Sequence, residues 1–260
     1  MKLNIVPART GITWVKRGIQ TFFKQPLALA GLFFMYMAAA TLASLIPVIG
    51  VVLALAIVPA ATLGLMAATQ EATKGKFPMP AILVSAFRAG KQRARAMMVL
   101  GFLYAAACLV IVSVVPLFFD VPASRESALT PEMQGVMLLV MVLYLPVSIL
   151  FWHAPALVHW HGVTPIKSLF FSAVVCFRNA GAYALFGLTW MAVLIVVGLV
   201  VSMLAGLLAS PEAAAALVMP AALLMAAMFS TSIYFTFEGS FDATPADSAD
   251  GNVISPGDTP

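Results

Sequence analysis

The sequence contains little charge. Lysine, arginine, aspartate and glutamate together make up 9% of the 260 residues, whereas hydrophobic residues make up 62%. In an average soluble protein about a quarter of the residues are charged, and a soluble chain of this length needs them to cover its surface. The composition therefore excludes a soluble globular protein and predicts a membrane protein.

Cysteine is also scarce. The two cysteines, Cys108 and Cys176, lie far apart in the chain and form no CxxC motif. This number and spacing exclude a disulfide-stabilised scaffold and a thioredoxin-like redox motif. We expect both residues to be free thiols that pack as small apolar side chains.

The three histidines, His153, His159 and His161, do not form a metal motif. Their spacings of six and two residues place them in different directions on a helix, whereas zinc-binding pairs on helices prefer a spacing of four. We expect them to lie at headgroup level beside Trp152 and Trp160, because such side chains suit the membrane interface. Neither a metal nor another cofactor is expected.

Long apolar segments are abundant. Each is about 20 residues or more in length, which is enough to cross a hydrocarbon core roughly 30 Å thick. None has a charged residue in its middle, and none shows the alternation of a β-barrel strand. The sequence therefore predicts an all-α integral membrane protein with six transmembrane helices, at 27–47, 49–70, 97–117, 134–156, 181–207 and 213–236.

The segments lack the groups that membrane chemistry uses. A proton relay needs a carboxylate within the spans, and an intramembrane enzyme needs paired carboxylates, a set of metal ligands or an activated nucleophile. Glu71 and Glu238 lie only at the ends of spans two and six, where we expect them to pair with Lys74, Arg88 or Arg178. The sequence thus predicts a protein that is not an enzyme.

The basic residues predict the orientation. Thirteen of the 14 precede span one or lie between spans two and three or spans four and five, and only Arg125 lies in an opposite loop. By the positive-inside rule, this side is cytoplasmic and both termini lie in the cytoplasm of a bacterial inner membrane. Because the bases flank membrane spans, the expected partners are anionic membrane lipids rather than nucleic acid.

Three segments precede the odd-numbered spans and resemble one another. Each runs from a proline through an amphipathic helix to Phe followed by Lys or Arg: Pro7 to Lys24, Pro80 to Arg88, and Pro165 to Arg178. Such helices lie in the membrane interface, and each here leads into a transmembrane hairpin. The alternative is chance similarity, since these features are common. The expected domain is 1–238, with pseudo-repeats at about 7–71, 78–156 and 165–238, and 239–260 is a disordered acidic cytoplasmic tail.

An internal proline occurs in the second span of every pair, at Pro59, Pro146 and Pro220. One interpretation is a kink that helps to build a binding cavity, as discontinuous helices do in many transporters. The other is that proline is simply frequent in membrane helices. The sequence favours neither.

Two segments resemble a known family. "FWHAPALVHWHGVTPIKSLFFSAVVCFRNAGAY" (151–183) and "STSIYFTFEGSF" (230–241), together with the layout of the chain, resemble an uncharacterised family of proteobacterial inner-membrane proteins. More distantly, the chain resembles YciC-like proteins and the membrane domain of some glycerophosphodiester phosphodiesterases. The resemblance implies a six-helix fold without an established activity. We expect no attached phosphodiesterase catalytic domain, so the resemblance does not imply that activity.

The favoured function is a non-enzymatic membrane module that contacts lipid or binds another envelope protein. The alternative is a transporter, channel or lipid translocator with a cavity beside the proline-containing helices. About 1 kcal/mol of attraction per basic residue near an anionic surface favours the first. The residues predicted to contact headgroups are Lys24, Arg88, Lys91, Arg93, Arg95, Lys167 and Arg178.

Overall fold

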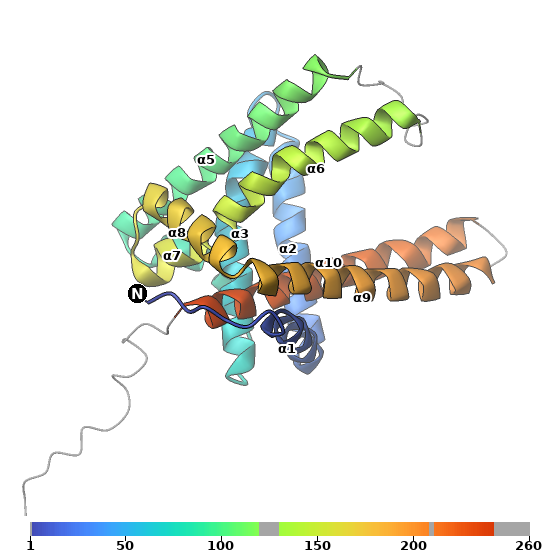
Figure 1. The fold of residues 1–260 in the computed structure, drawn as a ribbon, viewed down its shortest axis with the longest axis horizontal. Coiled ribbons are helices and arrows are strands. Elements are labelled where there is room, and N and C mark those ends of the chain that lie inside the picture. The colour runs from blue at the N-terminus through green and yellow to red at the C-terminus, as the bar shows by residue number, and fades with distance from the viewer. Residues whose placement is uncertain (1, 120–129, 208–210, 242–260) are drawn as a thin grey trace, which may run out of the picture.

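The protein is built from helices (Figure 1). The computed structural model describes residues 2–119, 130–207 and 211–241. Within these ranges the β-structure is limited to one isolated bridge between Leu3 and Phe241. Six of the described helices are long and apolar enough to cross a membrane. The predicted all-α, six-span fold is thereby confirmed.

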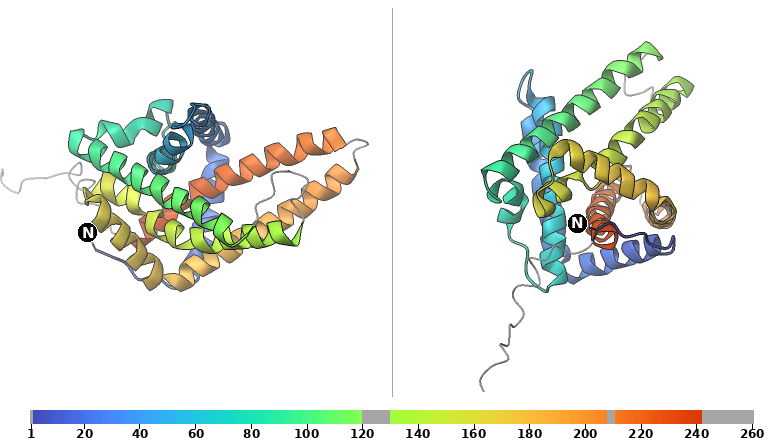
Figure 2. Two further views of the ribbon diagram at one scale, coloured as in Figure 1. Left: turned by 90° about the horizontal axis from the view of Figure 1, so that it is seen from above. Right: turned by 60° about the vertical axis from the view of Figure 1, so that its left-hand side comes forward.

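The six long helices form three hairpins that diverge from one another (Figures 1 and 2). Their open ends and the shorter helices make up a common base. Each helix agrees with a predicted span to within a few residues at most ends, because long uncharged runs leave few alternatives to a helix in lipid. The hairpins are α2 (Pro26–Ser44) with α3 (Gly50–Thr73), α5 (Lys91–Val114) with α6 (Pro131–Phe151), and α9 (Ala180–Gly206) with α10 (Pro211–Ser240); the 3-10 turn η2 (Val115–Leu117) extends α5.

Each hairpin is preceded by a helical segment at the base, but the three segments differ in size. Helix α1 (Thr10–Lys24) precedes the first hairpin and α8 (Pro165–Arg178) the third. The second is preceded by a 3-10 helix, η1 (Pro80–Val84), and a single α turn, α4 (Ser85–Arg88). The segment η1 lies close against α3, because a Cβ on Gly64 would stand 2.7 Å from Leu83 Cα. The triple repeat stays a prediction.

Helix α8 exposes its apolar face. Ile166, Phe170 and Phe177 are exposed, whereas Ser168 and Ser172 on the other face are fully buried against the protein. A helix that turns its large apolar side chains outward and its small polar ones inward is suited to the membrane interface, where the outer face meets acyl chains. The amphipathic pattern seen in the sequence therefore describes a face directed away from the core.

The fourth apolar run is divided into two helices. Helix α6 ends at Phe151, and α7 (Ala154–His161) begins three residues later. Pro155 has no N–H group to donate to the carbonyl of Phe151, and its ring clashes with that carbonyl in a continuous helix. The hydroxyl of Ser172 enters the resulting gap: it donates to the carbonyl oxygen of Ile149 at 2.8 Å and accepts from the N–H of His153 at 3.0 Å.

The two ends of the described chain meet at the base. Leu3 and Phe241 pair as a β-bridge, and the N–H of Asn4 donates to the carbonyl oxygen of Ser240 at 3.0 Å. Helix α10 thus continues to Ser240, and Phe241 is buried. The predicted start of the tail at residue 239 is therefore too early by three residues, because these residues close the base. The remaining tail, 242–260, and the loop containing Arg125 lie outside the described residues.

Candidate lipid-contacting surface

All seven basic residues that the sequence predicts at headgroups are exposed, and all lie near helix ends at the base. Two of them, Arg93 and Arg95, line one groove, and Arg88 lines a separate hollow. The other four are in the first turns of α5 and α8 or at the last residues of α1 and α8: Lys91, Lys167, Lys24 and Arg178.

The groove that contains Arg93 and Arg95 lies between the start of α5 and the connection from α7 to α8. It has a volume of about 520 Å³. Beside the two arginines its walls include the apolar side chains of Val99, Val158 and Ile166. A cationic end next to an apolar wall matches the chemistry of a phospholipid, whose anionic headgroup adjoins its acyl chains.

The shape of the groove depends on the short α7–α8 connection. Gly162 ends α7 with a φ of 64°, in the left-handed region that favours glycine. Thr164 is then extended, and Pro165 occupies the first turn of α8, where its missing N–H costs nothing. A Cβ on Gly162 would lie 4.0 Å from Arg93 Nη2, so the guanidinium rests directly beside this connection.

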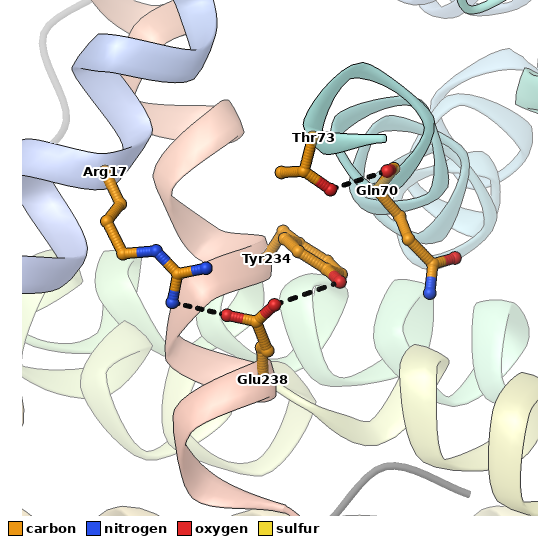
Figure 3. A network of polar contacts seen from close by, with 5 residues as sticks. All are labelled: Arg17, Gln70, Thr73, Tyr234 and Glu238. Atoms are coloured by element: carbon orange, nitrogen blue, oxygen red, sulfur yellow. Dashed lines mark hydrogen bonds and ion pairs between the residues drawn. The ribbon is translucent and has the colours of Figure 1, made fainter. Parts of the chain in front are cut away.

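Glu238 has a different partner from those predicted. Its carboxylate pairs with Arg17 of α1 at 2.5 Å, and the hydroxyl of Tyr234 donates to the other carboxylate oxygen at 3.4 Å (Figure 3). Arg17 also lies 4.4 Å from the ring centroid of Phe235. The predicted pairing with Lys74, Arg88 or Arg178 is wrong, because α1 packs alongside the end of α10 and brings Arg17 nearer. As a half-exposed pair it contributes about 1 kcal/mol or less.

His153 does not lie at headgroup level, so that prediction is wrong for this residue. Its side chain is fully buried among the rings of Tyr183, Phe237 and Phe241, because the break after α6 turns it into the base. Its Nε2 shares a hydrogen bond with the Tyr183 hydroxyl, which in turn contacts Ser240 Oγ at 3.0 Å. In the part of the chain that the structure describes, no three His, Cys, Asp or Glu side chains gather in a way that could hold a metal ion.

The three internal prolines have different surroundings. All three lie inside helices that continue past them. Pro59 is buried and lines a cavity of about 380 Å³, together with Tyr104, Tyr144 and Trp152. Pro146 and Pro220 are exposed on their helices. The break in the fourth span therefore occurs at Pro155 and not at any of the three internal prolines.

Sequence reasoning also missed the polar residues that join the base. Asn179 accepts the N–H of Val6 on Oδ1 and donates from Nδ2 to the carbonyl oxygen of Asn4, both at 2.9 Å. Trp190 Nε1 donates to Ser232 Oγ at 3.0 Å. A signal was present in α8, where Ser168 and Ser172 recur at a helical spacing on the side opposite the large apolar residues. This spacing does not identify the partners of these side chains, because the partners are distant in the sequence.

Comparisons with known proteins place the chain in a family. It is 35% identical over 254 residues to a protein of Burkholderia thailandensis named as a probable inner membrane protein, and the match covers 93% of this chain and 94% of the relative. The chain belongs to this family of inner-membrane proteins. No family model matches the sequence, and no solved structure matches it. The family assignment and the six apolar helices identify an integral inner-membrane protein.

Proposed function

We propose that this protein is a non-enzymatic module that binds anionic phospholipid in the groove of Arg93 and Arg95. The single observation that supports it is the arrangement of two exposed guanidinium groups beside the apolar wall of Val99, Val158 and Ile166. Arginine presents paired N–H donors that match phosphate oxygens, and the apolar wall suits the first part of an acyl chain. The remaining basic residues attract the anionic leaflet but do not line this groove.

Binding is tested by native mass spectrometry of delipidated protein mixed with phosphatidylglycerol or phosphatidylcholine. The double variant Arg93→Lys/Arg95→Lys keeps both charges but removes the paired donors. We expect it to retain about tenfold less phosphatidylglycerol than the parent. The control is Arg9→Gln, which removes an exposed charge outside the groove. Parent-like retention by the double variant, with a loss only in Arg9→Gln, would show that net charge alone matters and would overturn the groove proposal.

The same samples separate lipid from protein as the occupant. If no lipid is retained but a co-purifying envelope protein is lost from the double variant, the groove docks that protein and the lipid proposal is wrong.

We propose that this surface, and with it both termini, faces the cytoplasm. The supporting observations are the basic residues at the base and the pairing of Leu3 with Phe241, which holds the first and last described residues together. Fusions at the C-terminus to green fluorescent protein and to alkaline phosphatase test it. Fluorescence without phosphatase activity is expected, and the reverse would overturn the orientation.

The second candidate function is lipid translocation, and the cavities between the hairpins favour it. The cavity beside Pro59 and a second one of about 450 Å³ share Thr62, Phe229 and Ile233 in their walls. Their linings are mainly apolar, which suits an acyl chain better than a charged solute. Lipid translocation is measured by the quenching of fluorescent lipids in liposomes that contain the protein. Translocation by the parent that stops in Thr62→Trp, whose larger side chain occupies both cavities, supports this function. The absence of translocation by the parent refutes it.

We also propose the distant kinship with YciC-like proteins and phosphodiesterase-linked membrane domains. The repeated order of a base helix followed by a hairpin supports it. A solved structure from either group tests the kinship: it should show three hairpins on a shared base, and a different helix order would reject it.

A further inference from the structure

A second hollow at the base combines charges of both signs. It lies where the last turn of α3 meets α4 and α7, has a volume of about 460 Å³, and is lined by Glu71, Ser85, Arg88 and His159. Arg93 and Arg95 do not belong to its lining. It is therefore distinct from the anionic-lipid groove.

The polar groups of this hollow lack partners within the described chain. Glu71 and Arg88 both line it, but no ion pair within 4.0 Å joins them, since the ion pair found in the described residues is that of Arg17 with Glu238. Ser85 Oγ and His159 Nδ1 are buried and make no hydrogen bond. Buried polar atoms without partners are uncommon and costly, and a polar ligand in the hollow that reached Ser85 Oγ and His159 Nδ1 would supply the missing hydrogen bonds.

The chemistry of the four side chains specifies both ends of that ligand. Arg88 and the Ser85 hydroxyl are donors suited to a phosphate, whereas the Glu71 carboxylate is an acceptor suited to an ammonium group. His159 Nδ1 is a second acceptor when the imidazole proton is on Nε2. A ligand with a single charge would leave either Glu71 or Arg88 without a partner.

The rim of the hollow is apolar and exposed. Phe77 and Met79 are each 64% exposed and adjoin the charged groups. Large apolar side chains exposed at the base of a membrane protein are suited to the boundary between headgroups and acyl chains. The rim therefore favours a ligand that carries acyl chains.

We propose that this hollow binds a phosphoethanolamine group, with Arg88 and Ser85 at the phosphate and Glu71 and His159 at the primary ammonium, and that its source is the headgroup of phosphatidylethanolamine. The inference extends the proposed lipid-binding function by adding a site of different headgroup specificity. Because it uses residues and a lipid that the anionic groove does not, each proposal can fail without the other.

Native mass spectrometry of delipidated protein tests it with phosphatidylethanolamine, phosphatidylcholine and phosphatidylglycerol as probes. The parent should retain phosphatidylethanolamine over phosphatidylcholine, because methylation removes the N–H donors that Glu71 and His159 accept. Glu71→Gln should lower phosphatidylethanolamine retention about tenfold and leave phosphatidylglycerol retention unchanged. Lys74→Gln, an exposed change that follows Glu71 but does not line the hollow, is the matched control.

The outcomes separate the proposals. Equal retention of the ethanolamine and choline lipids, or equal losses in Glu71→Gln and Lys74→Gln, would overturn the phosphoethanolamine site. Loss of phosphatidylglycerol selectivity alone would overturn only the anionic groove. Soluble phosphoethanolamine, added as a competitor, tests the source: weak competition supports the lipid, whereas full displacement at low concentration would show that the free compound is the ligand. A thermal unfolding curve of each variant confirms that the protein is folded.

Discussion

The hydroxyl of Ser172 replaces a backbone hydrogen bond between Ile149 and His153. In an uninterrupted helix the N–H of His153 would donate to the carbonyl of Ile149, but here Ser172 Oγ lies between them, at 3.0 Å from the first and 2.8 Å from the second. A side chain inserted into the backbone ladder is one of the recognised causes of a helix break. One residue of α8 thus holds the ends of α6 and α7 in their relative positions.

Replacing Ser172 with Ala should destabilise the protein. The variant leaves the buried N–H of His153 without a partner, at a cost of about 1 to 3 kcal/mol, and leaves the carbonyl oxygen of Ile149 with only the thiol of Cys176, at 4.0 Å. Ser168→Ala is the matched control, because Ser168 is equally buried in α8 but its hydroxyl donates only to Pro165 in the same helix. Thermal unfolding in detergent should show a larger loss for Ser172→Ala. Similar losses would mean that the bridge contributes nothing of its own.

Asn179 should hold the N-terminal segment on the base. Its side chain makes two hydrogen bonds to the backbone, with Val6 and Asn4, and it is almost completely buried. In Asn179→Ala we expect the amides of residues 3–6 to exchange hydrogen faster, while the transmembrane helices are unchanged. Asn179→Asp keeps an acceptor for Val6 but loses the donor to Asn4, so it should be intermediate. Unchanged exchange in both variants would contradict this role.

The contact of α1 with α10 should tolerate no side chain at residue 18. A Cβ on Gly18 would stand 2.7 Å from Ser232 Cα, which is closer than such atoms approach. Although alanine favours a helix by about 1 kcal/mol over glycine, overpacking costs about 1 to 3 kcal/mol. Gly18→Ala should therefore lower the unfolding temperature. Gly187→Ala, in a helix position with nothing within 4 Å, should not lower it; the opposite ranking would disprove the close contact.

The thiol of Cys176 should react slowly with alkylating reagents. Burial raises the pKa of this thiol to about 12, so the reactive thiolate is scarce at neutral pH and its fraction increases as the pH rises toward that value. In a Cys108→Ser background, the rate of maleimide labelling measured by mass should rise up to about pH 10 without a plateau. The same protein unfolded in detergent should level off near the ordinary thiol pKa. A plateau near that ordinary value in the folded protein would argue against burial of the thiol.

The sequence predicted the features that follow from the transfer of each segment between water and lipid. The six helices follow from apolar runs that must satisfy their own backbone hydrogen bonds in lipid, and the exposed basic residues follow from the high cost of charge in that medium. The outward face of α8, with Phe170 and Phe177 exposed, follows from its amphipathic pattern. These features are local, so a single chain segment contains the information that specifies them.

The candidate sites were only partly predictable. The sequence grouped Arg88 with Arg93 and Arg95 because they are close along the chain, but the structure places Arg88 beside Glu71 and His159 instead. The amphipathic pattern could not show this, since the η1–α4 segment folds back along α3 before α5 begins.

By itself the sequence determined that this is a membrane protein, that it has six membrane-spanning helices, and which ends of those helices carry the positive charge. The reason is that the free energies of hydrophobic transfer and of charge burial act on each segment separately. Only the tertiary structure decided that Arg17 pairs with Glu238, that Ser172 bridges the break beside His153, and that Asn179 holds the N-terminus. Such contacts join residues distant in the chain, and their partners are selected by how the helices pack, which no single segment encodes.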